Sequence, residues 1–145
     1  MLVSELVPGA IAASAIAPAL LLLWLVVAAD SRPEPLWVVS TAVILGALST
    51  IPTGLLELWL LHIPISLNPW LAVDASTLLF ICFPEETVKI SIIAAIALRA
   101  RDFDEPMDGV VYGAAVGLGF AAVENLGYLR EAGTNWEMMA ITRAS

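Results

Sequence analysis

Two glutamates and a lysine interrupt a long apolar stretch of this chain, at Glu85, Glu86 and Lys89. The segments on either side, 78–82 and 90–96, carry no charged residue. A membrane span needs roughly 20 mainly apolar residues, so the stretch is long enough to cross a bilayer. Each charged group near the centre of such a helix costs about 2.5–3.5 kcal/mol on insertion. These three side chains are therefore expected to face protein, water or each other rather than lipid.

The spacing of the three charged residues predicts how they interact. In a helix, Lys89 lies four residues after Glu85 and three after Glu86, so its amine can pair with either carboxylate. Pro84 has no N–H, which frees the carbonyl of Phe80 and loosens the turn just before the acids. The sequence thus predicts two acids, one base and a local break in the backbone.

Composition places the chain among membrane proteins. It is 60% hydrophobic and 14% charged, with a mean hydropathy of +0.91, whereas soluble domains are roughly 45–50% apolar and 25% charged. We expect an all-α, polytopic membrane protein with a single transmembrane domain over residues 1–145. Its spans are expected at about 9–29, 36–62, 70–98 and 107–129, followed by a short interfacial C-terminal segment. The net charge of −8 and the lack of a basic run count against a nucleic-acid partner.

Charges outside the central stretch predict orientation. Arg32, Arg99 and Arg101 fall on one side of the expected spans, which places that side in the cytoplasm and the N-terminus outside the cell membrane. Glu57, near the far end of the second span, is read as an interfacial acid or as a polar group lining an access route to the site. The only histidine, His62, is expected to face headgroups at a helix end, which makes it a poor metal ligand.

Small residues recur every four positions in the fourth expected span. This small-xxx-small stripe predicts close approach of another helix, and it comprises Gly109, Gly113, Gly117 and Ala121. Glu124 lies about 20° from Gly117 around the helix, so it shares the side of the stripe.

The third and fourth spans are joined by a short loop, so they are expected to be antiparallel neighbours. With the loop ends level, Glu124 comes about one turn, roughly 6 Å along the axis, from Glu85. Three glutamates are therefore expected to meet near mid-membrane, beside Lys89 and Asn125. The residues alone leave three roles open: structural pairing between helices, a proton or ion path, and catalysis.

Three patterns together resemble the PrsW-type intramembrane proteases, which are similar to the wider CAAX-protease and Abi superfamily. The resemblance covers about residues 78–145. The patterns are Glu85-Glu86-x-x-Lys89, Phe103-Asp104-Glu105-Pro106-Met107-Asp108-Gly109-x-x-Tyr112, and Gly117-x-Gly119-Phe120-Ala121-x-x-Glu124-Asn125-x-x-Tyr128.

The resemblance implies cleavage of a membrane-anchored protein, such as an anti-sigma factor cut during envelope-stress signalling. It implies that Glu85 and Glu86 form the catalytic motif and that Glu124 and Asn125 form a second one. Phe120 begins a Phe-x-x-x-Glu spacing where the wider superfamily has Phe-x-x-x-His. The family usually continues with further helices, one with a histidine motif, so this chain is expected to be the N-terminal portion of a longer domain.

The mechanism expected from these residues is hydrolysis of a peptide bond by a glutamate-activated water. One of Glu85 and Glu86 acts as the general base. The other member of the pair, or Glu124, stays protonated and donates to the leaving amine, because neighbouring acids in a poorly hydrated site do not ionise together. Lys89 orients one acid, and Asn125 donates a hydrogen bond to the developing oxyanion.

Asp108 and Tyr112 are expected to be supporting groups at the mouth of the site. Phe120 is also expected to be a supporting residue. No cofactor is expected, because hydrolytic zinc sites normally use histidine and none lies near, although three carboxylates are able to hold a divalent ion. The expected partners are a single-span membrane protein substrate and the lipid bilayer. A proton-coupled carrier or ion pathway and a structural membrane scaffold are the competing functions.

Overall fold

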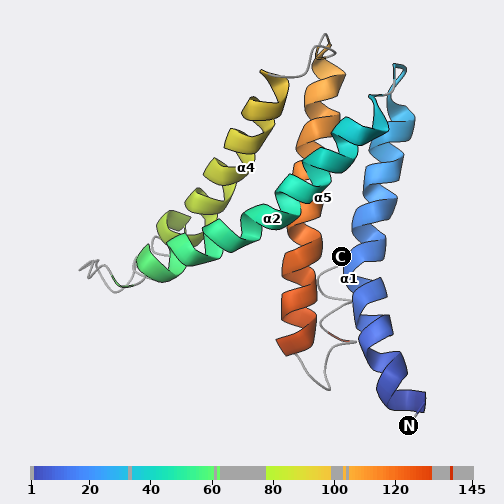
Figure 1. Ribbon diagram of the computed structural model, residues 1–145, viewed down its shortest axis with the longest axis vertical. Helices are drawn as coiled ribbons and strands as arrows, with labels where there is room; N and C mark the ends of the chain where they lie inside the picture. Colours follow the sequence, from blue (N-terminus) through green and yellow to red (C-terminus); the bar gives the residue numbers. More distant parts are fainter. Residues whose placement is uncertain are drawn as a thin grey trace.

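The computed structural model describes residues 2–32, 34–60, 62, 78–98, 103, 105–131 and 138. Within these residues the chain is helical, with α1 (Leu2–Ala29), α2 (Leu36–Leu60), α4 (Phe83–Ala97) and α5 (Pro106–Glu131) (Figure 1). A short π-helix, η1 (Leu78–Cys82), runs directly into α4. The described part contains no strand, and the expected all-α fold is confirmed. Residues 70–77 of the third expected span, and the expected C-terminal segment apart from Met138, lie outside the described residues.

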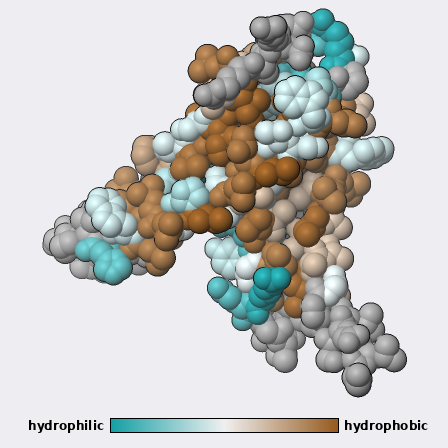
Figure 2. Space-filling view, in the orientation of Figure 1, coloured by the Kyte–Doolittle hydropathy of each residue, from teal (hydrophilic) through white to brown (hydrophobic). Residues whose placement is uncertain are grey.

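Three of the helices are long and apolar enough to cross a membrane, which makes the chain a multi-pass membrane protein. They cover Gly9–Ala29, Leu36–Leu60 and Pro106–Glu131, with mean hydropathies of 2.4, 1.7 and 1.4. Their outer faces carry large apolar side chains, among them Trp24, Trp37 and Trp59, each more than 60% exposed. Apolar residues dominate the central part of the surface in Figure 2. Such a surface suits lipid rather than water.

Helix α5 is the centre of the bundle, because α1, α2 and α4 all pack against it (Figure 1). One core cluster joins α5 to α2 through Val116 and Ala115 on α5 and Val39 and Ala42 on α2. A second cluster, at the other end of α5, joins it to α1 around Leu129.

Helices α2 and α5 cross in direct backbone contact. A Cβ atom added at Gly46 would lie 2.1 Å from the carbonyl oxygen of Val116, and one added at Gly119 would lie 2.2 Å from the carbonyl oxygen of Val43. Only glycine fits at these two positions, since the obstacle in each case is main chain. Because small residues let transmembrane helices approach closely, this crossing fixes the position of α2 on α5.

The four-residue stripe on α5, which predicts close approach of another helix, is not the face that meets α2. A Cβ at Gly109 or Gly113 would meet only side-chain atoms, at 3.7 Å and 4.0 Å, and one at Gly117 would meet nothing within 4 Å. The close contact belongs instead to Gly119, which lies about 160° around the helix from Gly117. The four-residue spacing identified a small-residue face of α5, but the α2 crossing uses another face.

A polar network ties the α1–α2 turn to the start of α5. The Arg32 guanidinium lies 2.8 Å and 3.0 Å from the two carboxylate oxygens of Glu105. The buried hydroxyl of Tyr112 donates a hydrogen bond to the buried Glu34, at 2.5 Å. Asp108, which is also buried, accepts a hydrogen bond from the backbone N–H of Glu105 at 2.9 Å. This N-terminal capping bond satisfies a backbone donor that the helix itself leaves open.

Candidate functional site

The glutamate pair sits where the backbone is irregular. Glu85 and Glu86 are in the first turn of α4, immediately after the π-helical turn η1, and Pro84 before them is buried. The expected local break is therefore present as a π-helix that ends at Cys82, two residues before this proline. Short π-helical segments inside helices occur frequently at functional sites, because they leave carbonyl groups with weaker partners and re-aim the following side chains.

Lys89 bridges the two glutamates. Its Nζ lies 2.8 Å from Oε1 of Glu86 and 3.4 Å from Oε2 of Glu85. The two partners differ in exposure, since the Glu86 side chain is 62% exposed while those of Glu85 and Lys89 are 18% and 16% exposed. The expected pairing within one helix is thus present with both acids. Glu85 is enclosed with the amine, and Glu86 holds the amine while keeping access to the surroundings.

The same amine also contacts α5. Nζ of Lys89 lies over the ring of Phe120, 4.1 Å from its centroid, and this ring is only 3% exposed. A desolvated cation–π contact of this kind contributes about 2 kcal/mol or more. The ammonium is therefore held on one side by two carboxylates of its own helix and on another by an aromatic face of the neighbouring helix.

A third helix brings another carboxyl group to this region. Glu57 on α2 is half-buried and lies within electrostatic range of Glu85 on α4 and Glu124 on α5. Glu124 and Asn125 follow Phe120 on α5 by about one turn and are half-buried as well. Glu57 of α2 thus lies in the same region as Glu85 of α4 and Glu124 of α5, whereas a meeting of the glutamates in one site stays a prediction. We call Glu57, Glu85, Glu86 and Glu124 the carboxyl cluster.

The sequence alone is compatible with an interfacial Glu57 or with a Glu57 along an access route. The pattern of buried residues on α2 nevertheless indicates where Glu57 lies. The buried face of α2 carries small residues at Ala42, Gly46, Ser49 and Thr53. Glu57 lies four residues beyond Thr53 and about 20° from Gly46 around the helix, so it continues this face. A carboxyl group at the end of a small-residue face points toward the packed neighbour rather than toward lipid.

Asp108 and Tyr112 are not part of this cluster. They lie 16 and 12 residues before Glu124 on α5, which places them about 24 Å and 18 Å away along the helix axis. Their contacts are with the α1–α2 turn and the start of α5, through Glu34 and Glu105. Any support that they give to the carboxyl cluster is indirect, through the position of α5, and their role at the mouth of the site stays a prediction.

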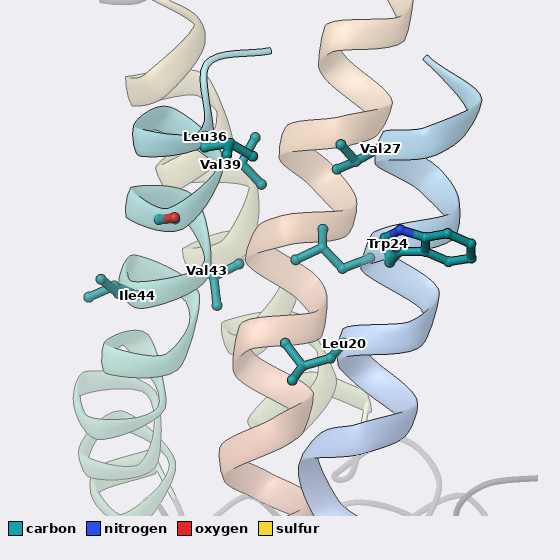
Figure 3. Close-up of a pocket in the computed structure, with 9 residues that line it drawn as sticks. Leu20, Trp24, Val27, Leu36, Val39, Val43 and Ile44 are labelled. Carbon is teal, nitrogen blue, oxygen red and sulfur yellow. The ribbon is translucent and has the colours of Figure 1, made fainter. Parts of the chain in front are cut away.

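An apolar groove of about 400 Å³ separates α1 from α2 (Figure 3). Its walls include Leu20, Trp24 and Val27 of α1 and Leu36 and Ile44 of α2, and no acidic residue lines it. In a membrane protein such a groove faces acyl chains. None of the four glutamates of the carboxyl cluster is among the described residues that line it.

Comparison with known proteins shows which family the sequence is similar to. A family model described as "PrsW family intramembrane metalloprotease" matches residues 34–144. The Protease PrsW of Oceanobacillus iheyensis is 31% identical over 122 residues, which are 82% of this chain and 54% of that protein. The Protease PrsW of Geobacillus kaustophilus is 34% identical over 115 residues, 79% of this chain and 48% of that protein.

A third relative has a higher sequence identity over a shorter segment. The Protease PrsW of Bacillus subtilis is 49% identical over 47 residues, which are 32% of this chain and 22% of that protein. The chain thus spans about half the length of the two curated relatives that it matches most extensively. No solved structure matches it.

Proposed function

Because the chain belongs to the PrsW family of intramembrane metalloproteases, we propose that it is an intramembrane endopeptidase that hydrolyses a peptide bond of a membrane-anchored protein. The observation that carries this proposal is the Lys89-bridged pair of Glu85 and Glu86, held against α5 through the ring of Phe120. Ionisable groups within membrane segments are costly and mark functional sites by default. The family membership selects peptide hydrolysis from the functions that such groups support.

In the proposed reaction a carboxylate activates a water molecule. Glu86 suits the base role, because Lys89 orients its carboxylate at 2.8 Å and its side chain is the more exposed of the pair. It takes a proton from water, and the resulting hydroxide forms a bond to the carbonyl carbon of the substrate. Glu85 or Glu124 then donates its proton to the leaving amine as the C–N bond breaks. Asn125, next to Glu124, donates a hydrogen bond to the oxyanion formed in between.

The family description includes a metal, and the described residues do not fit one. Among them, no group of three or more His, Cys, Asp or Glu side chains is arranged to hold a metal ion. The cation that lies between Glu85 and Glu86 is the ammonium of Lys89. A metal would need ligands from beyond the described residues, so every step above is assigned to side chains of this chain.

The proposed substrate is a single-span membrane protein, such as an anti-sigma factor, cut within or near its membrane segment. We place the protein in the cell membrane as a single transmembrane domain with its N-terminus outside, because Arg32, Arg99 and Arg101 share the opposite side. The carboxyl cluster lies among α2, α4 and α5, so the substrate segment would reach it between helices. Local unwinding is then required, because a helix shields its own peptide bonds.

The test uses Glu85→Gln, Glu86→Gln and Glu124→Gln in the full chain, each co-expressed with a candidate single-span substrate. Glu131→Gln, at the exposed end of α5, is the matched control. Because positioned acid–base groups contribute about 10²–10⁴-fold, we expect cleavage to fall at least about 100-fold in the first two variants, at unchanged membrane levels.

Three other outcomes refute the protease. Unchanged cleavage in both Glu85→Gln and Glu86→Gln removes the proposed reaction. Loss of ion or proton flux with no cleavage product in the wild type indicates a carrier or ion pathway. Failure of all three site variants to accumulate in the membrane, when Glu131→Gln accumulates normally, indicates a scaffold in which the charges fix helix packing.

A further inference from the structure

We propose that Phe120 is a positioning residue that fixes the ammonium of Lys89, and through it the glutamate pair, by a cation–π contact across the α4–α5 interface. This inference rests on the proposed function, because it assigns to Phe120 a part in orienting the residues of that reaction.

The geometry is that of a direct and desolvated contact. Nζ of Lys89 is 4.1 Å from the ring centroid, well inside the roughly 6 Å within which a ring face attracts a cation. The ring is 3% exposed and the lysine side chain 16% exposed, so little solvent competes with the contact. Burial without such a partner would leave one side of the charge without compensation.

An aromatic face at position 120 attracts the ammonium of Lys89 in a way that an aliphatic side chain does not. The Lys89 ammonium has three donors, and carboxylates of Glu85 and Glu86 already take hydrogen bonds from it. A ring face attracts the cation without accepting a proton and without adding a further acid to the carboxyl cluster. A leucine would fill similar space but offers no electrostatic attraction, so the amine would be free to shift between the two glutamates.

The contact also explains the Phe-x-x-x-Glu spacing on α5. Phe120 and Glu124 are one turn apart, about 6 Å along the axis and on the same face. Phe120 therefore anchors the α4 glutamates through Lys89 while Glu124 reaches the cluster from the next turn. Gly119, beside Phe120, is locked against the backbone of α2. One short segment of α5 thus sets the positions of both neighbouring helices around the carboxyl cluster.

The test replaces Phe120 in the full chain by mono-, di- and trifluorophenylalanine. Fluorine withdraws the negative charge from the ring face while leaving the ring shape nearly unchanged, so a purely structural ring would not respond. We expect kcat to fall stepwise with the number of fluorines, by about tenfold in total, which corresponds to about 1.4 kcal/mol at 25 °C. KM stays constant, because the contact orients the reacting groups and does not touch substrate. Phe120→Leu should lose at least as much as the trifluoro variant.

Phe103 is the matched control, since its ring stacks on Tyr112 at 6.0 Å near the other end of α5. Its fluorination should leave kcat unchanged. In a Lys89→Met background the Phe120 series should become flat, measured as kcat or, if this background has no activity, as the thermal midpoint of the purified protein. A kcat independent of fluorination in the wild-type background overturns the role of Phe120. The proposed function survives that result if Glu85→Gln and Glu86→Gln are inactive in parallel, and it fails separately if they cleave like the wild type.

Discussion

Replacing Gly46 by alanine tests the crossing that positions α2 on α5. The added methyl group would lie 2.1 Å from the carbonyl oxygen of Val116, whereas ordinary van der Waals contact begins at 3.4 Å. The methyl carbon would also lie 2.8 Å and 2.9 Å from the carbonyl carbon and Cα of the same residue. The overlap is with main chain, so no rotamer change relieves it. The two helices must separate locally by about 1.3 Å, the difference between 3.4 Å and 2.1 Å.

Two effects of opposite sign determine the size of the change. Alanine in place of glycine inside a helix gains roughly 0.5–1 kcal/mol in helix propensity. Overpacking of a close interface costs typically about 1–3 kcal/mol. We place Gly46→Ala at the upper end of that range, because backbone blocks the methyl group, and we expect a net loss of about 2 kcal/mol in the free energy of unfolding. Separation also shifts α2, and Glu57 with it, relative to α5.

The measurement is unfolding of the purified protein by denaturing detergent, followed by the fluorescence of its five tryptophans. Gly117→Ala is the control, because a Cβ there meets nothing within 4 Å, and it should be neutral or stabilising by up to about 1 kcal/mol. Gly119→Ala should match Gly46→Ala, and the double variant should cost less than the sum, because one separation relieves both overlaps. If Gly46→Ala and Gly117→Ala prove equally stable, the reasoning about this crossing is wrong.

Two further substitutions separate the polar network from the carboxyl cluster. Tyr112→Phe removes a donor from the buried Glu34, so it should lower the free energy of unfolding by about 1–3 kcal/mol without changing cleavage per folded molecule; a lower kcat at full folding would instead place Tyr112 in the reaction. Glu57→Gln removes the repulsion that Glu85 and Glu124 exert on this acid. The free energy of unfolding of this variant, measured in the same assay, should therefore be equal to or greater than that of the wild type. Glu85→Gln should instead lower the free energy of unfolding, because it weakens the Lys89 bridge. A Glu57→Gln variant less stable than Glu85→Gln would contradict the repulsion.

Interactions inside one helix were predictable from residue spacing. Lys89 pairs with Glu85 and Glu86 because residues three and four apart share a helix face, whatever surrounds the helix. The irregular turn before them follows from the missing N–H of Pro84, which lies two residues after the end of η1 at Cys82. The multi-pass character follows from segment length and hydropathy, which need no knowledge of packing.

Contacts between helices were harder to predict, as Gly46, Glu57 and Phe120 show. In water a hydrophobic stripe marks the buried face of a helix, but lipid is as apolar as a protein core, so the buried and lipid-facing sides of these helices look alike in sequence. Helix α5 has two glycine faces, and the four-residue period marks the one with Gly109, Gly113 and Gly117. The close crossing uses Gly119, because its backbone fits the glycine on α2.

The sequence by itself determined that this chain crosses the membrane several times, and that a lysine and two glutamates share one helix face, because both depend only on hydropathy and on the geometry of a single helix. Only the tertiary structure decided that Glu57 joins the carboxyl cluster and that Lys89 lies on the ring of Phe120. Both depend on the rotation and crossing of neighbouring helices, which backbone contact between two glycine positions sets and which hydrophobicity does not encode.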